Sequence, residues 1–156
     1  MIQRKHLLIV SHAPSENSRR LTDAVARGAS APEVEGVEVC VLRPFDAFPD
    51  HVLWSDAIIL GTTENFGYMS GALKDFFDRV YYPCLERTRG MPYATFVRAG
   101  NDGTGAHKSI ERITSGLRWR RVQESLICAG AFQQDFIRRC EELGMTMAAG
   151  LETGVF

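Results

Sequence analysis

Short runs rich in apolar residues alternate along this chain with longer segments whose apolar residues recur every three or four positions. The runs over residues 7–10, 38–42, 57–60, 93–97 and 124–128 predict buried β-strands. The segments between them predict amphipathic helices that pack onto those strands. Such alternation is typical of βαβ units with right-handed crossovers. We therefore expect an α/β fold, a three-layer α/β/α sandwich whose five-stranded parallel sheet has the order 2-1-3-4-5.

Helix boundaries follow from caps and breakers. The first helix is predicted over residues 18–28, and a later one begins at the N-cap Ser70 and is stopped by Pro83. The last helix is predicted over residues 133–152, although its interior Gly144 costs about 1 kcal/mol relative to alanine.

Composition narrows the class of protein. The chain has 156 residues, 45% of them hydrophobic and 24% charged, which predicts one globular domain over residues 1–156. Its apolar run near the N-terminus is too short for a signal peptide or a spanning helix, so we expect a cytoplasmic protein without a membrane partner. A net charge of −1 argues against a nucleic acid partner. The cysteines lie far apart and predict neither a disulfide framework nor a metal site.

In such a sheet a ligand binds at the carboxyl ends of the strands, where successive connections leave in opposite directions. This rule selects the loops after the first, third and fourth strands. The first loop has neither GxGxxG nor a Gly-Lys-Ser/Thr run, which excludes a dinucleotide fold and a P-loop. Strands ending in Ser11 and Gly61 lack the carboxylates of a receiver domain, and the first loop lacks the cysteine of a tyrosine phosphatase.

The first loop instead contains Ser11, Ser15, Asn17 and Ser18 just before a helix N-terminus, which favours a phosphate. The alternative interpretation is that Asn17 or Ser18 is only an N-cap in a solvated turn. The second loop joins Gly67 to Phe66 and Tyr68, whose rings can lie along a planar ligand or belong to the core or an interface.

A family resemblance rests on these loops. The Ser-rich first loop, GTTENFGYMSGALKDFFDR (61–79) and AGNDGTGA (99–106) together resemble the flavodoxin-like NAD(P)H-dependent flavin and quinone reductases. The match covers nearly the whole chain in element order and is strongest over 61–79. It implies a flavodoxin-like fold that binds FMN, with the phosphate on Ser11, Ser15, Asn17 and Ser18. The implied contacts of the flavin ring are Thr62, Thr63, Glu64, Asn65, Phe66, Gly67, Tyr68 and Met69, with Gly100, Asn101 and Gly103 on its other side.

Two departures from the family pattern lie in the second loop. Glu64 stands where the family usually has proline, and Asn65 where it often has tyrosine or threonine. These changes can loosen the loop or place a carboxylate near the flavin. The chain also lacks the long insertion of the larger tetrameric quinone reductases, so a homodimer stays an open alternative.

The resemblance implies hydride transfer from NAD(P)H through flavin N5 to a quinone, flavin or similar small acceptor. The protein then needs no catalytic acid, base or nucleophile and supplies geometry and N–H donors, for which we expect the backbone around Gly100 to Gly103. Basic residues at the carboxyl edge of the sheet are expected to meet the phosphates of NADPH; these are Arg19, Arg20, Arg98, His107 and Lys108. The cluster 118–121 is expected at the opposite edge.

Two other functions remain open. Flavodoxin-type electron carriers have the same fold but are typically strongly acidic, and a net charge of −1 argues against that role. A flavin-free binding module is the third possibility, because one fold hosts many functions.

Overall fold

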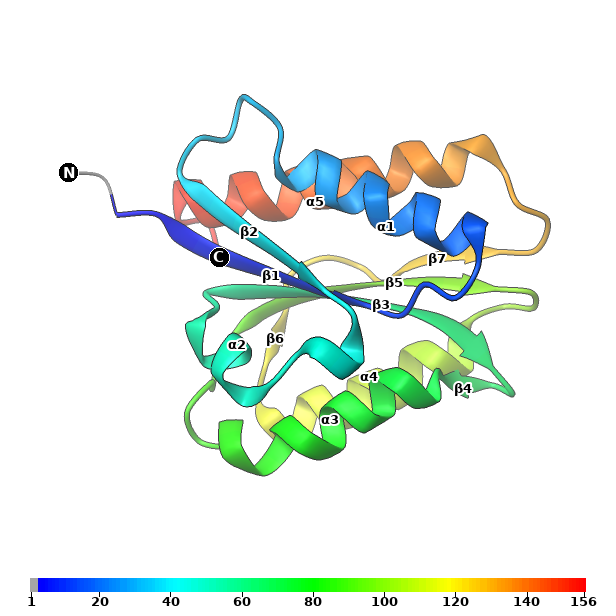
Figure 1. Cartoon of the computed structure of the whole chain (residues 1–156), viewed down its shortest axis with the longest axis horizontal. Coiled ribbons are helices and arrows are strands. Elements are labelled where there is room, and N and C mark those ends of the chain that lie inside the picture. The colour runs from blue at the N-terminus through cyan, green and yellow to red at the C-terminus, as the bar shows by residue number, and fades with distance from the viewer. Residues whose placement is uncertain (1–2) are drawn as a thin grey trace.

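A central parallel sheet lies between two layers of helices in the computed structural model, which describes residues 3–156 (Figure 1). The parallel strands are β1 (Lys5–Ser11), β2 (Val37–Leu42), β3 (Ala57–Asn65), β5 (Pro92–Ala99), β6 (Arg120–Arg121) and β7 (Leu126–Ala129). A short strand, β4 (Tyr68–Met69), pairs antiparallel with the end of β3.

Helices cover both faces of the sheet. One face is covered by α1 (Glu16–Ala29) and α5 (Gln134–Thr153), and the other by α3 (Gly71–Cys84) and α4 (Thr104–Leu117). The 3₁₀ turn η1 (Pro44–Asp46) and the short helix α2 (Pro49–Trp54) connect β2 to β3. The flavodoxin-like three-layer sandwich is thereby confirmed.

The strands run in the order β2-β1-β3-β5, followed by β6 and β7. This confirms the predicted order, but the fifth strand, expected over 124–128, is divided. The chain pairs with the start of β5 through β6, leaves the sheet, and pairs again with the end of β5 through β7. The hydroxyls of Thr95 and Ser125 lie 2.6 Å apart at the interruption. These two hydroxyl groups form a hydrogen bond with each other and do not extend the apolar core.

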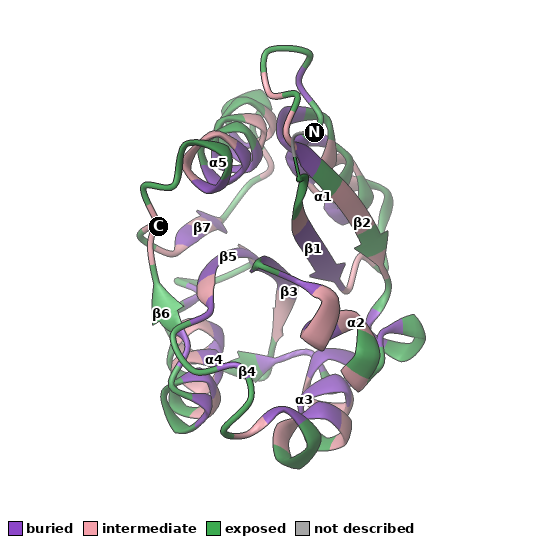
Figure 2. Ribbon diagram, turned by 90° about the vertical axis from the view of Figure 1, so that its left-hand side faces the viewer, coloured by how far each residue is buried: buried purple, intermediate pink, exposed green. Residues whose placement is uncertain are grey.

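Alternation along the strands builds two cores (Figure 2). In β1, Leu7 and Ile9 face α1 and α5, whereas Leu8 and Val10 face α3, and all four are fully buried. A strand that is apolar on both faces is what a covered parallel sheet requires.

Two helix ends differ from the prediction. The first helix starts at Glu16 and not at Ser18, because Ser15 is its N-cap. Pro83 does not stop α3: it lies inside the last turn, and the helix ends at Cys84. Proline removes one helical hydrogen bond and its ring crowds the preceding turn, which is tolerated in the last turn, and α3 ends one residue later.

Gly144 does not interrupt the last helix. A Cβ at Gly144 would collide with the carbonyl oxygen of Val25 on α1, and a Cβ at Gly28 would collide with that of Glu141 on α5. The two glycines therefore let the backbones of α1 and α5 approach closely. This packing offsets the propensity cost of a helical glycine.

Candidate functional site

The loops after β1, β3 and β5 meet at the carboxyl edge of the sheet, as predicted from the switch in connection direction. The His12 N–H, at the start of the first loop, donates to the Gly61 carbonyl on β3 at 3.0 Å. The first loop is thereby tied to the strand that carries the second.

Ser15 and Ser18 form a capping box at the start of α1. The Ser15 Oγ accepts from the Ser18 N–H at 3.1 Å, and the Ser18 Oγ accepts from the Ser15 N–H at 2.9 Å. The Ser11 hydroxyl lies 2.8 Å from that of Thr22. Asn17 accepts from Arg20 at 3.4 Å, so all four side chains predicted to hold a phosphate have protein partners.

Backbone N–H groups in the same loop remain free. Within residues 3–156, the N–H groups of Ala13, Glu16 and Asn17 have no protein acceptor. Unsatisfied donors at a helix N-terminus attract anions, because the helix dipole adds to their partial positive charge. The first loop therefore fits a phosphate through its backbone more than through its serine hydroxyls.

The second loop is a β-hairpin, and not the open loop predicted over 61–69. β3 continues to Asn65, and Phe66 and Gly67 form the turn with φ of 55° and 71°. Positive φ at both central residues is the geometry of a type I′ turn. The Phe66 ring at the tip is fully exposed, and Tyr68 is 42% exposed. A fully exposed aromatic side chain with a strained backbone does not stabilise the folded protein. This points to a binding role for Phe66.

Glu64 ties this hairpin to α4. Its carboxylate accepts from the N–H groups of Gly103 at 3.3 Å and Ala106 at 3.1 Å, at the start of the helix. The Gly103 N–H, one of the donors expected to face the flavin, is therefore occupied. The N-terminus of α4 would otherwise attract an anionic ligand, and the Glu64 carboxylate takes that position.

Two further contacts hold the hairpin in place. The Met69 N–H donates to the Ser109 Oγ at 3.1 Å, and a Cβ at Gly105 would collide with the Gly67 carbonyl. Ser109 and the role of Gly105 were not predicted, because nothing local in the sequence indicates that α4 packs against the tip of β3.

Thr62 and Thr63 have internal roles. The Thr62 hydroxyl is buried, donates to the Thr63 carbonyl at 2.7 Å and accepts from the Ser70 N–H at 2.9 Å. The Thr63 hydroxyl donates to the Asn65 side chain at 3.1 Å. Both threonines therefore shape the hairpin and fix the start of α3.

The third loop is open. Gly100 and Asn101 are exposed, and their N–H groups have no acceptor within the described chain. Asp102 caps α4 by accepting from the Thr104 N–H at 3.0 Å and its hydroxyl at 2.8 Å. These bonds with Thr104 lower the pKa of the Asp102 carboxyl.

The basic residues expected at this edge do not converge. Arg98 donates to the carbonyls of Ala99 at 2.7 Å and Cys128 at 3.0 Å. Arg20 lies over the ring of Phe132 at 5.0 Å from its centroid, on the α1 and α5 side. Both guanidinium groups are thus partly engaged within the protein.

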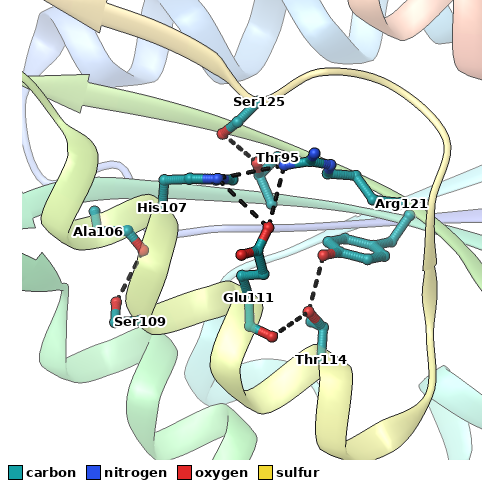
Figure 3. Close-up of polar contacts among 9 residues, drawn as sticks. Thr95, Ala106, His107, Ser109, Glu111, Thr114, Arg121 and Ser125 are labelled. Atoms are coloured by element: carbon teal, nitrogen blue, oxygen red, sulfur yellow. Dashed lines mark hydrogen bonds and ion pairs between the residues drawn. The ribbon is translucent and has the colours of Figure 1, made fainter.

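His107 is also engaged. Its Nε2 lies 3.3 Å from Arg121 Nη1 and 3.6 Å from the Glu111 carboxylate, a cluster beside the interrupted fifth strand (Figure 3). Arg121 itself pairs with Glu111 at 3.3 Å. Lys108 is exposed and forms no ion pair among residues 3–156, so it keeps its charge available.

Residues 3–156 contain no cluster of His, Cys, Asp and Glu arranged to hold a metal ion. No described helix is long and apolar enough to cross a membrane.

A doubly wound sheet with free N–H groups in its first loop and an aromatic hairpin as its second is the architecture of flavodoxin-like FMN-binding domains. The fold is similar to that of an archaeal flavodoxin (TM-score 0.79, 20% identity, 94% of this chain and 98% of that one). It is also similar to an NADH:FMN oxidoreductase in its apo form (TM-score 0.72, 15% identity, 94% and 90%).

The family described as NADPH-dependent FMN reductase matches residues 5–132, and the chain belongs to this family. Family membership assigns FMN as the cofactor. A flavodoxin from Aquifex aeolicus (strain VF5) is 29% identical over 99 residues, which span 64% of this chain and about half, 52%, of that relative.

Proposed function

We propose that the chain is an FMN-dependent oxidoreductase that takes hydride from NAD(P)H and passes electrons to a quinone, flavin or similar small acceptor. It works as a single domain over residues 1–156. The observation that carries this proposal is the pairing of free N–H groups at the start of α1 with an anchored aromatic hairpin on β3. One element suits a phosphate and the other a planar ring.

The described residues fit FMN. The N–H groups of Ala13, Glu16 and Asn17, with the side chains of Ser15 and Asn17, would hold its phosphate. Phe66 and Tyr68 would contact the ring from the hairpin. A Cβ at Gly100 would meet only open space, so the third loop leaves room beside the ring.

When bound, FMN supplies the acceptor for hydride, which no side chain of the protein can provide. The free N–H groups of Gly100 and Asn101 replace Gly103 as donors toward the added negative charge. The anchored hairpin holds the ring contacts in a fixed geometry, which keeps the reacting groups oriented. Lys108, in the first turns of α4, is exposed and would be free to meet a nucleotide phosphate.

Mixing the FMN-loaded protein with NADPH or NADH in the absence of air tests the proposal. We expect rapid loss of the visible absorbance of oxidised flavin, followed by its return when a quinone is added. Dithionite reduction serves as the control that the bound flavin is reducible. Free FMN with the same nucleotide gives the rate without protein.

The alternative is a flavodoxin-type electron carrier, which the similarity to flavodoxins favours. A carrier would be reduced by dithionite and by a reductase protein but not by NAD(P)H alone. That outcome would reject hydride transfer while leaving FMN binding intact.

We also propose a cytoplasmic location and keep a homodimer as a prediction. Sedimentation equilibrium of the purified protein distinguishes a monomer of 17.4 kDa from a dimer.

A further inference from the structure

A cavity of about 460 Å³ lies behind the first loop, away from the aromatic hairpin. It is bordered by the end of β1, one side of α1, the end of β2 and η1, and no residue that follows β3 or β5 lines it. Its volume is in the range of small-molecule sites. Its lining includes His12, Arg19, Asp23, Val41, Arg43 and Phe45.

The walls of this cavity are mainly apolar. The cavity is partly open to solvent, and Val41 and Phe45 at its border are 45% and 61% exposed. Apolar surface that stays in contact with water lowers the stability of the folded protein. A flat ring inserted beside Phe45 would remove that surface from water and stack on the phenyl ring.

Two arginines, Arg19 and Arg43, line the cavity. Arg19 forms no ion pair and no side-chain hydrogen bond within residues 3–156. Arg43 donates through Nε to Asp46 at 2.8 Å, which leaves its two terminal nitrogens without an acceptor in the same part of the chain. Guanidinium groups with free N–H donors bind carboxylate, sulfonate and phosphate groups in a forked geometry.

Two other ionisable groups line the cavity: His12, and Asp23, whose carboxylate opposes an anion placed close to it. Burial lowers the pKa of His12, so its ring is neutral near pH 7. Asp23 is four residues after Arg19 on α1, yet the two form no ion pair. The free guanidinium of Arg19 is thus the strongest available partner for a ligand charge.

We propose that this cavity is a second binding site, for a planar aromatic molecule that carries an anionic group. The ring lies against Phe45 and Val41, and the anion meets Arg19 and the free nitrogens of Arg43. The cavity shares Ala13 with the flavin site but none of the hairpin, so we expect its ligand to bind while FMN is also bound.

The test uses naphthalenesulfonate as the probe and naphthalenesulfonamide as an uncharged analogue of the same shape. Two-dimensional NMR of the labelled protein, with and without saturating FMN, locates and quantifies binding. We expect the sulfonate to shift the amides of residues 12, 41–43 and 45 in both conditions. The sulfonamide should bind at least about fivefold more weakly, because it lacks the charge.

Two pairs of variants separate the ring contact from the charge contact. Arg19→Gln and Phe45→Ala should each weaken sulfonate binding by about fivefold or more. Arg112→Gln, at an exposed arginine on α4, and Phe48→Ala, at a half-exposed ring just after η1, should leave it unchanged.

Three results would overturn the proposal. Shifts confined to residues 62–69 and 100–103, and abolished by FMN, would show that the probe occupies only the flavin site. Equal affinity for the sulfonate and the sulfonamide would remove the role of Arg19. A dimer that dissociates on Phe45→Ala in sedimentation experiments would show that a second copy of the chain covers this face.

Discussion

The carboxylate of Glu64 accepts a hydrogen bond from the Ala106 backbone N–H at 3.1 Å, and so joins the tip of β3 to the first turn of α4. Its other oxygen accepts from Gly103. The residue that departs most from the family pattern is therefore an anchor of the aromatic hairpin, and the carboxylate is directed at a helix terminus.

Glu64→Gln should lower the free energy of unfolding by about 1 kcal/mol, since a charged acceptor at a helix N-terminus is lost at a half-exposed site. Hydrogen exchange of the Gly103 and Ala106 amides should accelerate. Urea denaturation and exchange NMR measure the two effects. Glu33→Gln, at an exposed loop residue, is the control, and unchanged exchange at both amides would mean that Glu64 does not anchor the hairpin.

Gly105→Ala should destabilise the protein by about 1 to 3 kcal/mol, because the added methyl group collides with the Gly67 carbonyl. FMN affinity should fall with it, since the hairpin must move. Gly71→Ala, where the added methyl group meets open space, should be neutral or slightly stabilising. Thermal unfolding compares the two. Equal melting temperatures would contradict the close approach of hairpin and helix.

Phe66→Asn should change stability and binding in opposite directions. Asparagine tolerates the φ of 55° found at Phe66 and suits a type I′ turn before glycine, so the free energy of unfolding should rise by about 1 kcal/mol. FMN affinity should fall about tenfold because the ring contact is lost. Flavin fluorescence titration measures the affinity, with Tyr82→Ala on α3 as an exposed aromatic control. An unchanged affinity would show that Phe66 does not contact the flavin.

Ser15→Ala and Asn17→Ala together should weaken FMN binding by at least about tenfold, since each removes a hydrogen bond to a charged group. Ser15→Ala alone should also cost about 1 kcal/mol of stability, because Ser15 is the N-cap of α1. Asn17→Ala alone is therefore the cleaner probe of the phosphate. The control is Ser30→Ala at the far end of α1, and unchanged affinity in the double variant would place the phosphate elsewhere.

Stability should decline at alkaline pH through Cys84. Burial raises the pKa of its thiol from 9.0 to about 11. The unfolded chain then releases this proton before the folded chain does, so the free energy of unfolding is unaffected below pH 9.0 and falls up to about pH 11 at about 1.4 kcal/mol per pH unit. Cys84→Ala should flatten the decline in urea titrations across this range. An equally steep decline in the variant would assign it to other groups.

The sequence by itself determined the order of the elements and the loops that form the site, because apolar periodicity and caps are local properties. Leu7 to Val10 and the Ser70 N-cap could be predicted without knowing what they contact. The tertiary structure decided which groups stay free. Glu64 occupies the Gly103 N–H, and Gly144 is tolerated because α1 passes close to it. These contacts join residues far apart in the chain, and the spacing of residue types alone does not predict such tertiary contacts.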